Sequence, residues 1–160
     1  MTDVYARLNA LNIELPPVVV PDAKFQPYVI FDNTITLSGH LSKTGEQLNT
    51  GKFGADLTIE QGEKIARQLA VNLLGTLQGA VGDLNKIKKI INLNCMINGT
   101  QDFTDPHVVA NACSQVFHDV FGEKGYHSRN ALTVAQLPFG ACMEISLIAG
   151  IESQNRTGAI

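Results

Sequence analysis

Two charged side chains stand out in the last third of the sequence, because Arg129 and Glu144 are the only charged residues between positions 128 and 150. Arginine is suited to hold a carboxylate through two parallel hydrogen bonds. A glutamate on a largely apolar strand can have its pKa tuned, and it can then move a proton or position a water. The residue types alone leave two interpretations open, a carboxylate-binding site and a structural ion pair.

These two residues lie in β-prone runs that flank a short Pro/Gly connection around Phe139, which predicts a β-hairpin. With the turn at this point, Val134 lies opposite Glu144, and Arg129 lies opposite residues near Ala149. The two charges are then not direct cross-strand partners. They meet at one ligand only if the ladder bends or if the pocket draws on two subunits. The pattern favours a site at a subunit interface.

The other reactive side chains predict no further chemistry. The histidines lack the spacing of metal ligands, so we expect structural or solvent-facing roles and no metal site. No G-x-S-x-G segment occurs that would form a serine nucleophile elbow. The cysteines are odd in number, widely spaced and without a cationic setting, which indicates reduced core thiols. These residues are His40, His107, His118 and His127, and Cys95, Cys113 and Cys142.

Three helices are expected to support the strands. A short one covers Thr2–Asn12, with Thr2 as its N-cap. The clearest one runs over Thr58–Gly82, where a capping box precedes a stripe of leucines at helical spacing. The third begins at Thr104 or Asp105 and has a proline at its first position.

The remaining segments predict strands and a loop. Two β-prone runs, Tyr28–Phe31 and Thr34–Leu37, form a hairpin. Ser38-Gly39 follows, where glycine permits close approach of a ligand or neighbouring chain, or marks a simple bulge. Val18–Val20 is expected to be a brief strand, and 42–56 a polar surface loop.

One more strand, Ile87–Ile97, alternates between a buried and a mixed face. The order past the first helix is therefore ββαβαββ, an α+β fold with two helices on one face of a mainly antiparallel sheet. The opposite face must be polar or covered by another chain. Apolar residues on both faces of the later strands favour an oligomer packed sheet to sheet. We expect Ile91, Leu93, Cys95 and Ile97 on the buried face, and Ile90 and Met96 on the mixed face.

Composition describes a single domain. The chain has 160 residues, 17% of them charged, and a formal net charge of −3. This charge makes nucleic acid an unlikely partner, because non-specific binding depends on clustered Lys and Arg. No run approaches the ~18 apolar residues of a membrane span, and no signal peptide is visible, so we expect a cytoplasmic protein. Residues 1–150 form the expected domain, with a helical extension at 1–14 and a flexible tail at 151–160.

Several segments together resemble the YjgF/RidA family, also known as the L-PSP endoribonuclease-like or reactive-intermediate deaminase family. Residues 129–138, R-N-A-L-T-V-A-Q-L-P, followed by M-E-I at 143–145, are similar to its R-S-x-V-x-V-x-x-L-P…V-E-I-E-A signature. Residues 32–41 resemble its G-N-x-x-x-x-S-G-Q-I segment. Residues 109–112 and 121–125 resemble its longer branch, which carries an extra N-terminal helix. The resemblance covers about residues 15 to 150.

The resemblance implies a chorismate-mutase-like fold, a homotrimer with clefts between subunits, and hydrolysis of reactive enamines or imines to a 2-keto acid and ammonia, without a cofactor. By position, Arg129 matches the arginine that binds the substrate carboxylate, and Glu144 the glutamate that handles the attacking water. The other matched cleft positions are Ser38, Gly39 and Asn111. Three residues depart from the pattern: Phe25 replaces a cleft tyrosine, Ala131 stands where a cysteine often sits, and Asn130 replaces a serine.

Three functions follow as hypotheses. The first is a cofactor-independent deaminase acting on small 2-imino acids such as 2-iminopropanoate. The second is a non-catalytic module that binds a 2-keto acid or similar carboxylate metabolite, or another protein, through the same cleft. The third is the ribonuclease activity of the family's older name, which the acidic composition disfavours.

Overall fold

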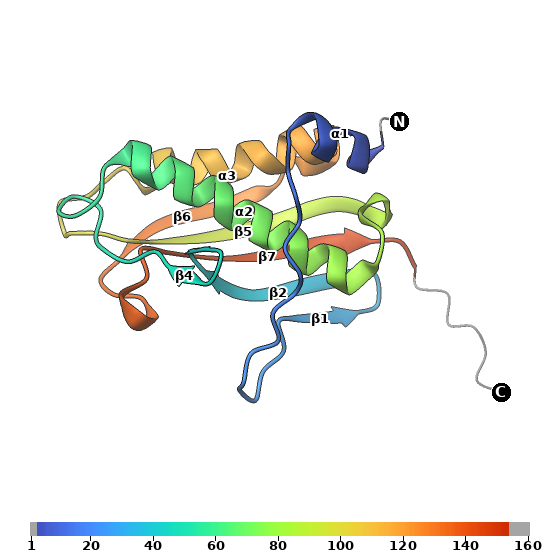
Figure 1. Ribbon diagram of the computed structural model, residues 1–160, viewed down its shortest axis with the longest axis horizontal. Helices are drawn as coiled ribbons and strands as arrows, with labels where there is room; N and C mark the ends of the chain where they lie inside the picture. Colours follow the sequence, from blue (N-terminus) through green and yellow to red (C-terminus); the bar gives the residue numbers. More distant parts are fainter. Residues whose placement is uncertain (1–2, 154–160) are drawn as a thin grey trace.

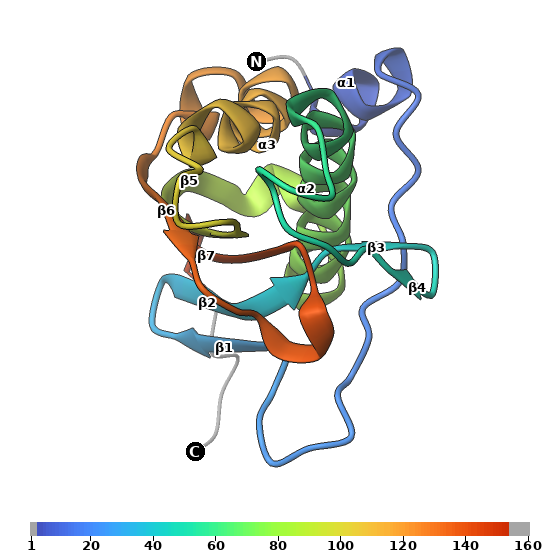
Figure 2. The same cartoon turned by 90° about the vertical axis from the view of Figure 1, so that its left-hand side faces the viewer.

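The computed structural model describes residues 3–153, which form a five-stranded sheet with helices on one face (Figures 1 and 2). The strands lie in the order β1-β2-β7-β5-β6. An α+β fold with two long helices on one face of a mainly antiparallel sheet is thus confirmed. The helices are α1 (Val4–Ala10), α2 (Ile59–Val81) and α3 (Pro106–Phe121), and the main strands are β1 (Tyr28–Phe31), β2 (Thr34–Leu41), β5 (Ile87–Asn98), β6 (Ser128–Val134) and β7 (Met143–Ile151).

Local signals place the helix ends. The α2 helix starts at the predicted capping box of Thr58 and Gln61, and it ends at Gly82, whose φ of 72° is left-handed. The α1 helix is capped by Asp3, whose carboxylate accepts a hydrogen bond from Ala6 N, so Thr2 is not its N-cap. Thr2 itself lies outside the described residues. A carboxylate suits this position because it also faces the positive end of the helix dipole.

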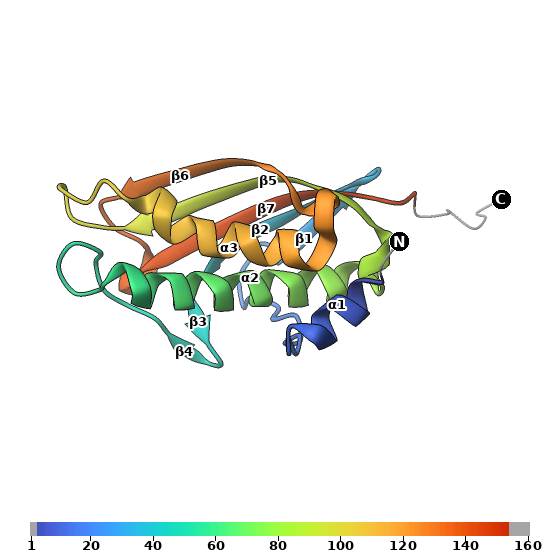
Figure 3. The ribbon, with the colours of Figure 1, turned by 90° about the horizontal axis from the view of Figure 1, so that it is seen from above.

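The predicted C-terminal hairpin is wrong, because β6 and β7 do not pair. β6 instead pairs in parallel with β5, and β7 pairs with β5 and β2, so that β5 separates the two strands (Figure 3). The Pro138–Gly140 segment forms a 3₁₀ turn within a connection that passes over the end of β5, where Asn98 N donates to Cys142 O. Short-range pattern cannot distinguish such a crossing from a tight turn, because both need the same turn residues.

Two further expectations fail for local reasons. The faces of β5 change near its start, since a register shift between Ile90 and Asn92 buries Ile90 and leaves Ile91 42% exposed. A bulge inserts one residue and so exchanges the faces on either side of it. The 42–56 segment is not simply a surface loop, because it holds the small β3–β4 hairpin (Lys43–Thr44 and Gln47–Leu48) and buries Phe53.

Residues 13–27 form an extended segment that runs from α1 across α2 towards β1 (Figures 1 and 2). Val18–Val20 is not a strand, and Val19 and Val20 are exposed. The segment passes so close to α2 that a side chain at Gly75 would overlap the carbonyl oxygen of Pro16. Proline and valine thus serve here to cover a helix and not to extend the sheet.

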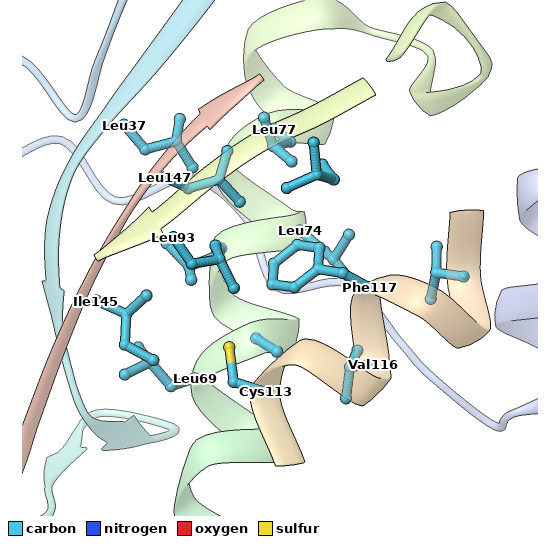
Figure 4. Close-up of a cluster of buried hydrophobic side chains, with 14 of the residues drawn as sticks. Leu37, Leu69, Leu74, Leu77, Leu93, Cys113, Val116, Phe117, Ile145 and Leu147 are labelled. Atoms are coloured by element: carbon cyan, nitrogen blue, oxygen red, sulfur yellow. The ribbon is translucent and has the colours of Figure 1, made fainter. Parts of the chain in front are cut away.

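The hydrophobic core lies between the sheet and the two long helices (Figure 4). Leucines of α2 pack against the inward face of the central strands, and buried side chains of α3 pack into the same core beside them. The contributing side chains include Leu37, Leu93, Ile145 and Leu147 from the sheet, Leu69, Leu74 and Leu77 from α2, and Cys113, Val116 and Phe117 from α3. The opposite face of the sheet has no helical layer and exposes Val29, Phe31 and Leu132.

Candidate functional site

Arg129 lies on β6 beside Leu93 of β5, and its side chain points towards α3. Its Nη1 atom donates to Oδ1 of Asn111 and to Oγ of Ser114, each at 3.0 Å. These two bonds use both hydrogens of Nη1. Within residues 3–153, Nη2 and Nε make no hydrogen bond, so three N–H donors remain on a guanidinium held in place by α3. Arg129 lines an open cavity of about 600 Å³ between α3 and residues 125–129.

Ser114 and His127 line the same cavity and are joined by a hydrogen bond. Ser114 Oγ lies 2.9 Å from Nε2 of His127, and His127 Nδ1 lies 2.6 Å from the carbonyl oxygen of Gly125. A carbonyl only accepts, so Nδ1 carries the hydrogen and Nε2 of the neutral ring accepts from Ser114. Burial lowers the pKa of His127, with the nearby charges of Arg129 and Lys89 acting in the same direction.

Sequence reasoning missed this pair. The sequence predicts only a structural or solvent-facing role for His127 and gives no reason to single out Ser114. One signal was available, because residues two apart in extended backbone point to the same side, which places His127 with Arg129. Its hydrogen-bond partner Ser114 on α3 has no comparable signal, because their contact depends on how α3 is oriented about its axis against β6.

Glu144 lies on β7 between Leu41 of β2 and Met96 of β5. Its neighbours Met143 and Ile145 are buried under the helices, so alternation puts Glu144 on the uncovered face of the sheet. Partial burial raises the pKa of its carboxyl. No described basic group forms an ion pair with it, which removes the structural ion pair with Arg129 as an interpretation.

Gly39 lies directly against Glu144. A Cβ at position 39 would overlap the Glu144 carboxylate, so this glycine makes room for the acid. The register between β2 and β7 shifts at this point, between Leu37 and His40. The predicted bulge at Ser38-Gly39 is therefore confirmed, and the close approach that Gly39 permits is that of the Glu144 side chain on the neighbouring strand. Approach of a ligand or of a second chain at this glycine stays a prediction.

Phe25, Ser38 and Gly39 line a second cavity of about 550 Å³, bounded by residues 14–27, β2 and α2. Phe25 is 53% exposed there. Ser38 is held by its hydroxyl, which donates to Gln26 O at 2.6 Å. Ala131 lies elsewhere, on β6 beside Cys95, and packs against the core.

The predicted site residues therefore form two groups on one chain. Arg129 and Asn111 meet at the cavity beside β6, whereas Phe25, Ser38 and Gly39, with Glu144 next to Gly39, gather around β2 and β7. β6 is one edge strand of the sheet, and β1 and β2 lie at the other edge (Figures 2 and 3). The two groups lie on opposite sides of β5, so they do not share a pocket within one chain.

Two further features concern the described residues as a whole. Between residues 3 and 153, no three His, Cys, Asp or Glu side chains gather in a way that could hold a metal ion. Across the same range, no helix is both long enough and apolar enough to cross a membrane.

Comparison with known proteins identifies the family. Residues 5–151 match the family described as "YjgF/chorismate mutase-like, putative endoribonuclease". The chain belongs to this family, which confirms both the resemblance noted in the sequence and the chorismate-mutase-like fold.

Individual relatives align over almost the whole chain. Protein TCP17 of Trypanosoma cruzi is 37% identical, over 94% of this chain and 95% of that protein. A protein of unknown function from Agrobacterium tumefaciens superposes with a TM-score of 0.84 at 34% identity, covering 93% of this chain and 94% of the other. A "putative endoribonuclease" from Shewanella oneidensis superposes with a TM-score of 0.89 at 29% identity, covering 94% and 100%.

Proposed function

We propose that the protein hydrolyses small reactive 2-imino acids, or their enamine tautomers, to a 2-keto acid and ammonia, in pockets shared between the subunits of a homotrimer. The observation that carries this proposal is the free side of the Arg129 guanidinium, which Asn111 and Ser114 fix at an open cavity. Three donors in a rigid fork match the carboxylate of an imino acid, and they discriminate against a substrate without one.

The second half of the site supplies the proton acceptor. Glu144 stands against Gly39 on the uncovered face, and burial raises its pKa, which makes its carboxylate a stronger base than an exposed one. In the proposed step, a water oxygen attacks the imine carbon while Glu144 accepts the water proton. Glu144 passes this proton to the imine nitrogen, which gives a carbinolamine. The carbinolamine hydroxyl then loses its proton to the nitrogen as the carbon–nitrogen bond breaks, so ammonia leaves and the 2-keto acid remains. No redox step or cofactor is needed.

The separation of the two groups of candidate site residues supports a pocket formed by two subunits. Arg129 and Asn111 lie at the β6 edge, and the Phe25, Ser38, Gly39 and Glu144 group lies towards the β1–β2 edge. One copy must bring its first group to the second group of its neighbour. Such a contact is head-to-tail, and in a closed assembly it produces a ring. The uncovered face exposes three apolar side chains, those of Val29, Phe31 and Leu132, and burial of this face in the ring would remove them from water.

The departures from the family pattern bear on the substrate. Phe25 places an apolar ring at the second cavity where the pattern has a tyrosine, which removes a hydroxyl group from the lining. This change favours an imino acid with an apolar side chain. Ala131 lines neither cavity and packs against the core, so its methyl group in place of a thiol carries no argument about the substrate. The cysteines Cys95, Cys113 and Cys142 are free and buried, which supports a reducing compartment such as the cytoplasm.

The test is an assay in which an amino-acid oxidase generates the imino acid in situ and semicarbazide traps what remains. The wild-type protein is expected to speed imine loss, and Arg129→Ala to lower kcat/KM roughly 10- to 100-fold, since a hydrogen-bonded charge is worth about 1.5–3 kcal/mol. Arg67→Ala, which alters an exposed arginine of α2, serves as the matched control.

Two results would point elsewhere. If the wild-type protein leaves the imine half-life unchanged but binds 2-keto acids in an Arg129-dependent titration, the protein is a carboxylate-binding module. RNA cleavage is the second candidate function, favoured by the description of the family. The net charge of −3 weighs against it. Cleavage that survives repeated purification and disappears in Glu144→Ala would support it.

A further inference from the structure

The cavity beside β6 holds a chain of hydrogen bonds that extends beyond the Arg129–Ser114 contact to His127 and Gly125, and carboxylate binding does not explain this extension. Arg129 Nη1 donates to Ser114 Oγ, Ser114 Oγ donates to His127 Nε2, and His127 Nδ1 donates to Gly125 O, at 3.0, 2.9 and 2.6 Å. A hydroxyl, a base within hydrogen-bond reach and a third group that orients the base make up the general signature of an activated nucleophile. The hydroxyl and the base both line the cavity.

We propose that Ser114 is a nucleophilic serine with His127 as its base, and that this cavity cleaves carboxylic esters with small acyl groups. Ser114 is half-buried on α3 and open to the cavity. The proposal does not depend on imine hydrolysis, since it needs neither Glu144 nor a second subunit.

The neutral state of His127 suits this role. A base must have a free lone pair on the nitrogen that faces the hydroxyl, and the bond from Nδ1 to Gly125 O fixes that tautomer. Burial lowers the pKa of His127, which keeps the ring uncharged at neutral pH. Arg129 adds a positive charge 3.0 Å from Oγ, where it stabilises negative charge that develops next to the serine oxygen.

The chemical steps balance without a co-reactant other than water. Ser114 Oγ bonds to the ester carbonyl carbon, its proton passes to His127 Nε2, and the carbonyl oxygen becomes an oxyanion near Arg129. The bond from carbon to the alkoxy oxygen breaks, and the alcohol leaves with the proton from Nε2. Water then attacks the acyl-serine and gives its proton to Nε2. The acid is released as Ser114 regains its hydrogen.

A fluorophosphonate probe tests the proposal directly. We expect the wild-type chain to gain one probe mass, located on Ser114 by peptide mapping, and to release p-nitrophenol from p-nitrophenyl acetate with a burst of about one equivalent per chain. Ser114→Ala should lose both signals. His127→Gln should slow labelling by roughly 10²–10⁴-fold, the range of general-base catalysis. Ser146→Ala, on β7 and away from this cavity, should label like the wild type.

The wild-type protein decides the matter even if a variant folds poorly. A chain that shows no adduct, or an adduct on another serine, overturns the proposal. Labelling of Ser114 that is equally fast in His127→Gln also overturns it, because the base would then have no role. Imine hydrolysis is measured separately, so the failure of either activity leaves the other result intact.

Discussion

Arg129 and Glu144 lie on opposite sides of β5 and on opposite faces of the sheet. Arg129 is in register with Leu93, whose side chain is buried beneath the helices, and Glu144 is in register with Met96 on the uncovered face. A small imino acid cannot touch both side chains of one chain. Any reaction that needs both residues must therefore recruit them from two chains.

Mixing two inactive variants tests this conclusion. Arg129→Ala lacks the proposed carboxylate fork and Glu144→Gln lacks the proposed base, yet in the proposed ring a mixture of the two would place an intact Arg129 next to an intact Glu144 at some interfaces. Random assembly from equal amounts should restore about a quarter of the wild-type imine hydrolysis, since each pocket draws two independent residues from neighbouring subunits. The measurement requires unfolding and refolding the two variants together. A pocket built within one chain would give no restoration.

Asn111 is expected to matter through Arg129. Asn111→Ala removes the acceptor for one Nη1 hydrogen while leaving Ser114 in place. Loss of one such bond costs about 1 kcal/mol, so KM for the imino acid should rise roughly fivefold with little effect on kcat. Gln115→Ala is the matched control, because Gln115 lines the same cavity but donates to Asp119. Equal effects of the two changes would show that Asn111 has no particular link to the arginine.

Gly39 should be intolerant of a methyl group for a functional reason. In Gly39→Ala the new Cβ would displace the Glu144 carboxylate, which is the flexible end of a long side chain. We expect a small change in melting temperature and at least a tenfold fall in kcat, which matches the loss of a positioned base. Gly150→Ala on β7 is the control, because its nearest neighbour, Ile91 Cδ1, lies 3.7 Å from the added atom. Loss of activity in both would point to a general effect on the sheet.

The pH dependence should follow Glu144. Burial raises the pKa of Glu144, and a base must be deprotonated to accept a proton, so kcat should fall on acidification at a higher pH than an exposed glutamate would give. The contribution of Glu144 to folding stability changes with pH in the opposite direction to kcat. A raised pKa in the folded state adds stability below the unfolded value, and that stability is lost as pH rises through the folded value. In Glu144→Gln, the residual activity should no longer fall on acidification. The free energy of unfolding should also depend less on pH, as measured by thermal unfolding at each pH.

The thiols should be inert in the folded protein. Burial raises the pKa of Cys95 to about 11, and it also raises the pKa values of Cys113 and Cys142. The thiolate is the reactive form. Ellman's reagent at pH 8 should therefore leave the native protein unmodified and react with all three cysteines after denaturation. Rapid reaction of the native chain would mean that one of these positions opens to solvent.

Local features could be predicted from the sequence, and pairing across distant segments could not. The β1–β2 hairpin and α2 depend on neighbours within a few residues, and both agree with the prediction. The sequence predicts the wrong partner for the strand that carries Arg129, because this strand lies nearest to β7 in the sequence but pairs with β5 after α3 crosses over. Parallel pairing requires a long crossover and leaves no turn signature.

The site divides in the same way. Arg129 and Glu144 stand out in the sequence as the only charged residues of their segment, and Ser38-Gly39 as a glycine at a strand end. Asn111 is selected only because it matches the family pattern by position. Ser114 belongs to no such pattern, and its contact with His127 depends on the packing of a helix against an edge strand. Side chains brought together by tertiary packing leave little trace in spacing, which is why they were found only in three dimensions.

The edge position of β6 has a consequence for assembly. Its outer side has no strand neighbour within the described chain, and an unpaired edge can template another chain. A head-to-tail contact made from this edge closes into a ring only when the rotation between successive subunits divides a full turn; any other rotation continues into an open filament. In the proposed ring, substitutions at the exposed Leu132 that tilt this contact would then convert a closed assembly into an open filament without altering the fold of each chain.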